Sequence, residues 1–480
     1  MLHLYRLKNL NTLSLELVVN FKTLFRNVSL VLLTTLPLLL GVVSSGCDAS
    51  NSEKTPEEFH TDKLEVLWEI WEILQEEFVE REFLDPKRLT AGAISAMKMV
   101  ADETDGATGF PAYDPPDTVP IDLIPIWDKW VSLMGPNKEN NLRLNSDTLI
   151  NHAIAGFLSE LADPYTQYIP QSEFKVTHSN LEGEYQGIGA EIYLKGTDFI
   201  LNPLPNSPAE LAGIMPGDEL IWVNGEQING WTLIELVSKV RGPKGTNVNL
   251  GILRAGLEGP NEIGVTRGRI KMESVYWKLT DDQIAYIQLR AFYANSDETL
   301  SGVLNEIQER GATGLVLDLR NNPGGYLETV SRITSEFLSE GIVAYEKGPD
   351  GKETNWKIKG GGKALDIPMV ILVNELSASA SEVLTGALQD YGRAVIIGTR
   401  TYGKGSVNRL QKLSNGGGLY YTYARWYTPK GRLIEGKGLD PDVMVSQDGQ
   451  IIGTPEDPQL NSGLDTLRRK IQASPELSLD

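Results

Sequence analysis

The chain has 480 residues, of which 41% are hydrophobic and 22% are charged. This composition excludes a chain that is disordered throughout, and the length is enough for about three folding units. Because 64 acidic residues outweigh 44 basic ones, the net charge of -20 repels phosphate backbones, and no nucleic-acid partner is expected. The single cysteine, Cys47, excludes an internal disulfide, a cysteine-rich zinc site and an iron–sulfur cluster.

The first residues have the pattern of an export signal, which we assign to residues 1–46. Basic side chains precede an almost wholly apolar run, Val28–Val43, which is shorter than the ~20 residues that span a bilayer and so favours a cleaved signal over a permanent membrane helix. Cys47 directly follows and resembles the cysteine of a bacterial lipobox, although Ser44 stands where a leucine-like residue is usual. We therefore expect an exported protein of the cell envelope, with Cys47 as candidate lipid and membrane anchor and residues 47–61 as a polar tether.

Residues 62–180 are predicted to be helical. Between Asp62 and Glu82 apolar residues recur at helical spacing, with glutamates on the opposite face, which predicts an amphipathic helix whose two tryptophans are core or interface residues. Residues 89–102 and 149–162 repeat a common helical pattern at an offset of sixty positions.

Residues 181–257 change to short β runs separated by glycines. Together with the sequence SPAELAGIMPGDELIWVNG, this stretch resembles a PDZ domain. The resemblance implies that Gly187, Ile188, Gly189 and Ala190 present backbone N–H groups to the terminal carboxylate of a peptide that adds as a strand. The alternative for these four residues is a tight turn that uses glycine for its dihedral angles alone.

Residues 258–448 alternate between strand and helix, which predicts crossover units on a largely parallel sheet. Catalytic groups in such sheets gather at the carboxyl ends of the strands. The predicted strands are Ile284–Leu289, 314–319, 368–374 and 394–398, and the predicted helices are 297–310 with Ser296 as cap, 327–339 and 380–391.

The sequence SASASE passes from a buried strand into one of these helices and places Ser379 at its start. A turn of small residues at a helix amino terminus exposes hydroxyl groups and directs N–H dipoles at an oxyanion formed there. The alternative is structural, because Ser379 and Glu382 also have the spacing of a capping box.

Lys404 lies between two glycines after the next strand, and two interpretations compete. The stretch nearly matches a phosphate-binding loop, but Gly405 stands where the metal-binding hydroxyl belongs, and a strand-like stretch follows where a helix should begin. The other interpretation makes Lys404 a base. No histidine follows His178, so a serine in this half lacks its usual proton acceptor, and a lysine can replace it when burial among apolar groups keeps its amine neutral.

Several ordered motifs resemble the carboxyl-terminal processing, or tail-specific, serine proteases over residues 62–472. They are LDLRNNPGG, SASASE, YGKGSV, WYTPKGRLIEGKGLDPDV and, near the end, DPQLNSGLDTLRR. The resemblance implies a multidomain α+β protein with a helical N-terminal region, a PDZ β-rich module, an α/β catalytic domain of the crotonase/Clp-protease-like class over 258–448 and a C-terminal segment, 449–480.

The same resemblance implies roles for individual residues. Ser379 would be the nucleophile and Lys404 the general base. The N–H group of Ala380, with that of Gly324 or Gly325, would form the oxyanion hole.

Two further residues are implied with alternatives. Asp390 matches an acid that supports the site in some relatives, and would otherwise be a charge on the helix surface. Asn408 stands where many relatives carry a glutamine that orients the ammonium group, and its amide is one methylene shorter.

These inferences predict a serine endopeptidase that cleaves proteins near their C-terminus, with the PDZ module binding the C-terminal tail. No metal or organic cofactor is implied, and the sequence makes no prediction of oligomeric state. The alternative is an inactive PDZ scaffold on a protease-like fold, with Asn408 as one sign of lost activity.

Overall fold

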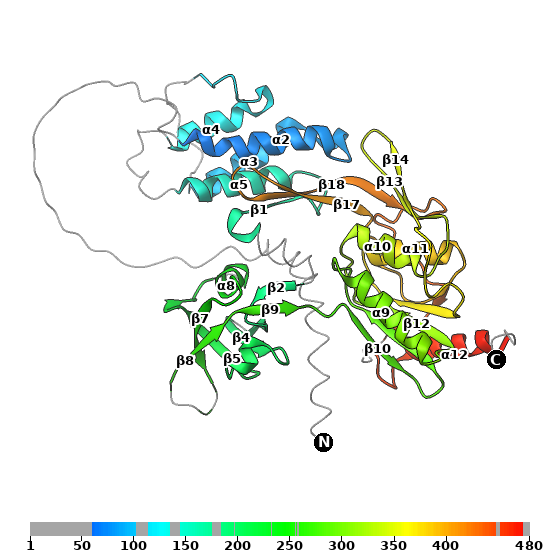
Figure 1. Ribbon diagram of the computed structural model, residues 1–480. Helices are drawn as coiled ribbons and strands as arrows, with labels where there is room; N and C mark the ends of the chain where they lie inside the picture. Colours follow the sequence, from blue (N-terminus) through cyan, green and yellow to red (C-terminus); the bar gives the residue numbers. More distant parts are fainter. Residues whose placement is uncertain are drawn as a thin grey trace, which may run out of the picture. The chain divides into compact units, whose positions relative to one another are not determined.

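A computed structural model describes residues 60–101, 114–134, 145–174, 184–195, 197–231, 233–254, 256, 259–447 and 452–473 (Figure 1). These residues form two compact units, of which the second comprises Leu74–Arg81 and the chain from Asp163 onward. The predicted export signal and Cys47 lie outside the described residues. Within the described ranges, no helix has the length and apolar content that crossing a membrane requires.

The first unit is helical, but it ends at Ala162 rather than at the predicted residue 180, because the chain from Asp163 belongs to the second unit and forms a strand at Gln167–Ile169. It contains most of α2 (Glu65–Glu77), together with α3 (Pro86–Val100), α4 (Ile124–Met134) and α5 (Ser146–Ser159). Both tryptophans of α2 are buried, and the ring of Trp71 meets that of Phe157 edge-on at 6.0 Å. The repeated segments become α3 and α5, which pack together at Gly92 and Gly156. A Cβ atom at Gly92 would lie 2.3 Å from the carbonyl oxygen of Gly156, so the two helices touch backbone to backbone.

The β-rich module contains a pair of antiparallel strands and a six-stranded sheet. β2 (Glu184–Gly187) pairs with β9 (Gly268–Lys271). The larger sheet has the order β3-β4-β5-β7-β8, with β6 beside β5. Its strands are β3 (Ala190–Lys195), β4 (Asp198–Pro203), β5 (Asp218–Val223), β6 (Glu226–Gln227), β7 (Asn247–Leu253) and β8 (Asn261–Thr266). The module also contains two helices, α7 (Pro208–Leu211) and α8 (Leu233–Val240).

The α/β domain is built on a six-stranded sheet of order β10-β11-β12-β15-β16-β19. Its strands are β10 (Val275–Leu279), β11 (Ile284–Leu289), β12 (Gly314–Asp318), β15 (Met369–Val373), β16 (Val395–Gly398) and β19 (Val443–Met444). Every neighbouring pair is parallel except β10 with β11. The four predicted strands and the largely parallel sheet are therefore confirmed.

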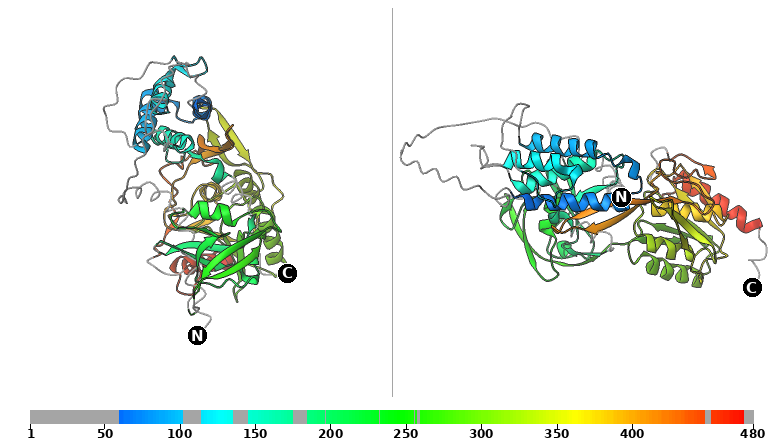
Figure 2. Two further views of the ribbon diagram at one scale, coloured as in Figure 1. Left: turned by 90° about the vertical axis from the view of Figure 1, so that its left-hand side faces the viewer. Right: turned by 90° about the horizontal axis from the view of Figure 1, so that it is seen from above.

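Alternating side chains of these strands supply two cores. Ile287, Leu317 and Ile371 face the helices α9 (Ser296–Glu309), α10 (Leu327–Ser335) and α11 (Ala380–Asp390). Tyr286, Val316 and Val370 face α12 (Pro458–Ala473), the red helix in Figures 1 and 2. A strand buried on both faces has no polar alternation, which explains the continuous apolar runs of the sequence.

The predicted helix boundaries need two corrections. Ser296 is the first residue of α9 rather than its cap, and its hydroxyl accepts the Tyr293 N–H and donates to the Ala291 carbonyl. The next helix, α10, ends at Ser335, whereas the sequence pattern predicts an end at residue 339.

A second sheet of the same domain has the order β1-β18-β13-β14, with β17 beside β18. It contains β1 (Gln167–Ile169), β13 (Ile342–Lys347), β14 (Glu353–Lys357), β17 (Ser406–Lys412) and β18 (Gly418–Tyr427). Because the residues after Lys404 form the strand β17, the helix that a phosphate-binding loop requires is absent at this position, and that interpretation is wrong.

Candidate active site

Ser379 occupies the turn between β15 and α11 in a strained backbone conformation. Its dihedral angles are φ 56° and ψ -117°, in a region that costs a non-glycine residue about 1–3 kcal/mol. The turn follows the carboxyl end of a central parallel strand, where ligands meet such sheets. This strained turn places Ser379, which is half-buried, at the amino terminus of α11.

Gly324 and Gly325 lie against this turn with positive φ angles of 99° and 144°. A Cβ atom at Gly324 would lie 2.8 Å from the Cβ of Ser379 and 2.9 Å from the Ala380 nitrogen. The Gly324 N–H group donates to the side chain of Asn322 at 2.8 Å. Within the described part of the chain, the N–H groups of Gly325 and Ala380 donate to no protein acceptor. The geometry therefore favours Gly325 over Gly324 as the partner of Ala380 in an oxyanion hole.

The carboxylate of Glu382 joins the serine turn to the lysine loop. Its Oε1 accepts the Thr401 hydroxyl at 2.6 Å and the Gly403 N–H at 2.7 Å. Its Oε2 accepts the N–H groups of Ser379 at 2.9 Å and Lys404 at 2.8 Å. Since both bonds end on one oxygen, the two nitrogen atoms are at most 5.7 Å apart, the sum of these distances.

Glu382 is fully buried, and burial raises the pKa of its carboxyl group while its four hydrogen bonds oppose that rise. The sequence pattern identifies Glu382 as a capping residue alone. Its role as a bridge depends on a loop that lies some twenty residues later in the chain, which no local pattern reveals.

The amine of Lys404 lies over aromatic rings, 4.8 Å from the ring centre of Tyr165 and 5.8 Å from that of Tyr420. Tyr165 precedes β1, and Tyr420 belongs to β18. Among the described residues, no hydrogen bond joins this amine to the Ser379 side chain. The structure thus brings the backbones of the two residues together and holds the lysine amine against the two tyrosine rings in cation–π contacts.

Asn408 has its amide group engaged across the second sheet. It donates to the Thr422 hydroxyl at 2.9 Å and accepts the Ser406 hydroxyl at 3.0 Å. Thr422 in turn donates to Asp163 at 2.6 Å. In the described part of the chain, no hydrogen bond links Asn408 to Lys404.

Asp390 is the last residue of α11, eleven positions and therefore roughly 16 Å along the helix from Ser379. It is buried, pairs with Arg432 and accepts the Lys430 N–H at 2.8 Å. The structure does not bring Asp390 to the reacting serine. The alternative of a surface charge is also wrong, because the carboxylate fixes the end of α11 to the loop after β18.

The glycine-rich turn of the β-rich module connects β2 to β3. The carbonyl groups of Ile188 and Gly189 accept the N–H groups of Ala209 and Leu204 at 2.8 and 2.9 Å. Within the described ranges, the N–H groups of Ile188 and Gly189 donate to no backbone carbonyl. A Cβ atom at Gly189 would lie 2.6 Å from the Ser207 Cβ, so glycine is needed here for packing as well as for its φ of 72°.

Comparison with known proteins identifies both modules. Residues 283–445 match peptidase family S41, and residues 199–254 match a PDZ domain. The chain carries an S41 peptidase domain and a PDZ domain. Ser379, Lys404 and Asn408 all lie in the matched S41 residues, whereas the turn from Gly187 to Ala190 precedes the matched PDZ residues.

The relatives are probable CtpA-like serine proteases. The chain is 38% identical over 313 residues to one from Staphylococcus epidermidis, covering 65% of this chain and 63% of the relative. It is 38% identical over 312 residues to one from Staphylococcus aureus, covering 64% and 62%. The chain thus spans a little under two thirds of the length of these relatives. A solved photosystem II D1 C-terminal processing protease is similar at 24% identity and a TM-score of 0.46, covering 80% of this chain and 94% of that one.

Proposed function

We propose that this chain is a serine-type endopeptidase that cleaves proteins near their C-terminus, with Ser379 as nucleophile and Lys404 as general base. The observation that carries the proposal is the strained Ser379 at the amino terminus of α11, beside N–H groups of Gly325 and Ala380 that donate to no acceptor among the described residues. Strain of this kind persists where the surrounding structure over-determines it, and it concentrates at functional sites. The S41 match and the CtpA-like relatives support the same reaction class.

The proposed reaction passes through an acyl-enzyme. The neutral amine of Lys404 takes the proton of the Ser379 hydroxyl as the oxygen attacks the scissile carbonyl carbon. The N–H groups of Gly325 and Ala380 stabilise the resulting oxyanion. The lysine then protonates the leaving amine, and water releases the acyl group. For the first step, the amine must leave the rings of Tyr165 and Tyr420.

The PDZ domain is proposed to capture the substrate. The N–H groups of Ile188 and Gly189 are free of backbone acceptors within the described ranges, so they are available to a terminal carboxylate, and the tail would add as a strand along β3. The partners would be proteins or peptides with accessible C-terminal tails.

The test uses purified full-length chain and a denatured polypeptide with an apolar C-terminal tail. Wild type should cleave it, and Ser379→Ala should abolish cleavage while leaving tail binding intact. Cleavage should increase with pH as the base loses its proton, and Lys404→Ala should not regain activity at high pH.

The second candidate is an inactive PDZ scaffold. It is favoured by the position of the Lys404 amine on the tyrosine rings and by the engaged amide of Asn408. A wild-type chain that binds the tail across a wide pH range and never cleaves it would decide for the scaffold.

We also propose export and lipid attachment at Cys47, on the sequence pattern described above. Mass measurement of the mature amino terminus tests it, because a diacylated cysteine and an unprocessed leader differ in mass.

A further inference from the structure

We propose that Asp457, in the segment before α12, is a positioning residue that acts through Arg320 to fix the loop 320–325 beside Ser379. The inference rests on the proposed peptidase function, because it assigns a role within that site. Asp457 belongs to the motif DPQLNSGLDTLRR, to which neither the proposed chemistry nor tail binding assigns a role.

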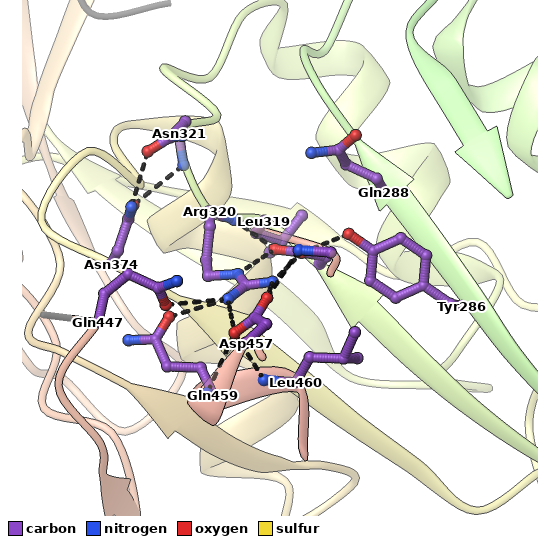
Figure 3. Close-up of polar contacts among 12 residues, drawn as sticks. Tyr286, Gln288, Leu319, Arg320, Asn321, Asn374, Gln447, Asp457, Gln459 and Leu460 are labelled. Carbon is purple, nitrogen blue, oxygen red and sulfur yellow. Dashed lines mark hydrogen bonds and ion pairs between the residues drawn. The ribbon is translucent and has the colours of Figure 1, made fainter. Parts of the chain in front are cut away.

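Arg320 is fully buried. Figure 3 shows that its guanidinium group donates hydrogen bonds to several side chains. Asp318 accepts from Nε at 2.9 Å and from Nη2 at 2.6 Å. Asp457 binds Nη1 at 2.9 Å and Nη2 at 2.8 Å. Gln459 and Gln447 also accept from Nη1, at 3.1 and 3.2 Å. Two bidentate carboxylates therefore fix the plane of the guanidinium group from two sides.

The carboxylate of Asp457 is itself held rigidly by its own segment. Its Oδ2 accepts the Gly453 N–H at 2.7 Å, and its Oδ1 accepts the N–H groups of Gln459 and Leu460 at 3.1 Å each. Burial alone would raise the pKa of Asp457, but the hydrogen bonds and charge of Arg320 lower it overall. Asp457 is therefore a fixed anion that links the start of α12 to the end of β12.

Asn321, the residue after Arg320, is the next fixed point of the loop 320–325. Asn321 has a positive φ of 60°. Its N–H donates to the Asn374 side chain at 3.0 Å, and Asn374 donates back to its side chain at 2.7 Å (Figure 3). The loop is thus joined to the carboxyl end of β15, the strand that leads to the serine turn.

Asn322 then connects the loop to both parts of the oxyanion site. Its Oδ1 accepts the Gly324 N–H at 2.8 Å. Its carbonyl group accepts the Ala378 N–H at 3.0 Å and the Ser381 hydroxyl at 2.9 Å. A shift of Arg320 would therefore be passed on to the turns that carry the Gly325 and Ala380 donors.

Charge balance does not explain the second carboxylate. Asp318 by itself would balance the charge of Arg320, so adding Asp457 gives a buried cluster of two anions and one cation, which is costly to desolvate. Asp457 instead fixes the orientation of the guanidinium group. It comes from 137 residues away and binds the Nη1–Nη2 edge, whereas Asp318 binds the Nε–Nη2 edge.

The test compares Asp457→Asn with Asp282→Asn. The control removes the exposed ion pair of Asp282 with Arg468 of α12, so it loosens the same helix without touching Arg320. Asp457→Asn should lower kcat roughly 10- to 100-fold with KM nearly unchanged, since small displacements of catalytic groups cost rates of this order. Asp457→Glu should recover part of the loss, and Asp282→Asn should retain wild-type kcat.

Hydrogen exchange supplies a readout that does not depend on activity. The amides of Asn322, Gly324 and Ala378, which donate to acceptors in the folded structure, should exchange faster in Asp457→Asn than in wild type, while the strand β11 keeps its protection. Gln459→Leu, which keeps both carboxylates, should show the same effects more weakly and serves if Asp457→Asn fails to fold. Unchanged kcat and unchanged exchange in a folded variant would overturn the proposal. A wild type that never cleaves would refute the proposed function. The exchange comparison would still decide whether Asp457 acts through Arg320 on the loop 320–325.

Discussion

At the scale of single residues, the serine turn and the lysine loop depend on one buried carboxylate. Glu382 accepts four hydrogen bonds, and all four donors belong to Ser379 or to residues 401–404. A carboxylate suits this position because both of its oxygens are acceptors, whereas an amide offers one acceptor and one donor.

Glu382→Gln should therefore turn an NH2 group toward two hydrogen-bond donors, either the N–H groups of Ser379 and Lys404 or the Thr401 hydroxyl and the Gly403 N–H, and displace the serine turn or the lysine loop. We expect cleavage to fall at least about 100-fold, comparable to the loss of an oxyanion donor. Glu375→Gln is the matched control, since Glu375 lies on the same turn, is exposed and binds the Thr399 hydroxyl at 2.9 Å. Equal activity of the two variants in a cleavage assay would contradict the assignment.

Tyr165 offers a test of the resting position of Lys404. Tyr165→Leu removes a ring that the amine must leave before it can take the Ser379 proton, a contact of about 0.5–1 kcal/mol, so kcat/KM should rise roughly two- to fivefold. Tyr165→Phe keeps the ring and should leave kcat/KM at the wild-type value. Asp163, Glu435 and Tyr402 interact with Tyr165 and are unchanged in both variants, so an equal change of kcat/KM in both would argue against the ring contact.

At the scale of elements, two glycines in helices have opposite environments. Gly92 of α3 packs against the backbone of Gly156 in α5. Gly302 lies exposed in α9, where an added Cβ atom would have no atom of the described residues within 4 Å. Substitution by alanine should therefore have opposite signs at the two positions.

Gly92→Ala should lower the free energy of unfolding by about 1–3 kcal/mol, the usual cost of overpacking. Gly302→Ala should raise it by about 0.5–1 kcal/mol, because alanine is the better helix former. Thermal unfolding measures both. A stabilising Gly92→Ala would show that α3 and α5 do not touch at this point.

At the scale of the whole molecule, the buried cluster around Arg320 predicts how stability depends on pH. The folded structure lowers the pKa of Asp457, so its contribution is present above the ordinary aspartate pKa of ~3.9 and is lost as pH falls through the lower folded value.

Urea unfolding of wild type and Asp457→Asn between pH 7 and pH 3 tests this dependence. The variant should be less stable by roughly 1–3 kcal/mol near neutral pH, the cost of a buried charged hydrogen-bond partner. The difference should shrink at acidic pH. A difference that grew on acidification would mean that the pKa of Asp457 is raised instead.

Local sequence patterns are enough to specify the elements and the positions of the chemical groups along the chain. The strands 284–289 and 314–319, the helix after Ser379 and the strand after Lys404 are encoded by nearby residues, through apolar runs, caps and glycines. The absence of histidine after His178 likewise points to lysine as the base from the sequence alone.

Which groups meet is set by the tertiary structure instead. In the folded chain the Gly324 N–H donates to Asn322, and Asp390 lies at the far end of α11 from Ser379. The Lys404 amine contacts the ring of Tyr165, and Asp457 binds Arg320. Partners such as Lys404 and Tyr165, or Arg320 and Asp457, are far apart in sequence. Their contacts arise because sheet order and helix packing bring distant segments together, and a pattern of neighbouring residues carries no information about such distances.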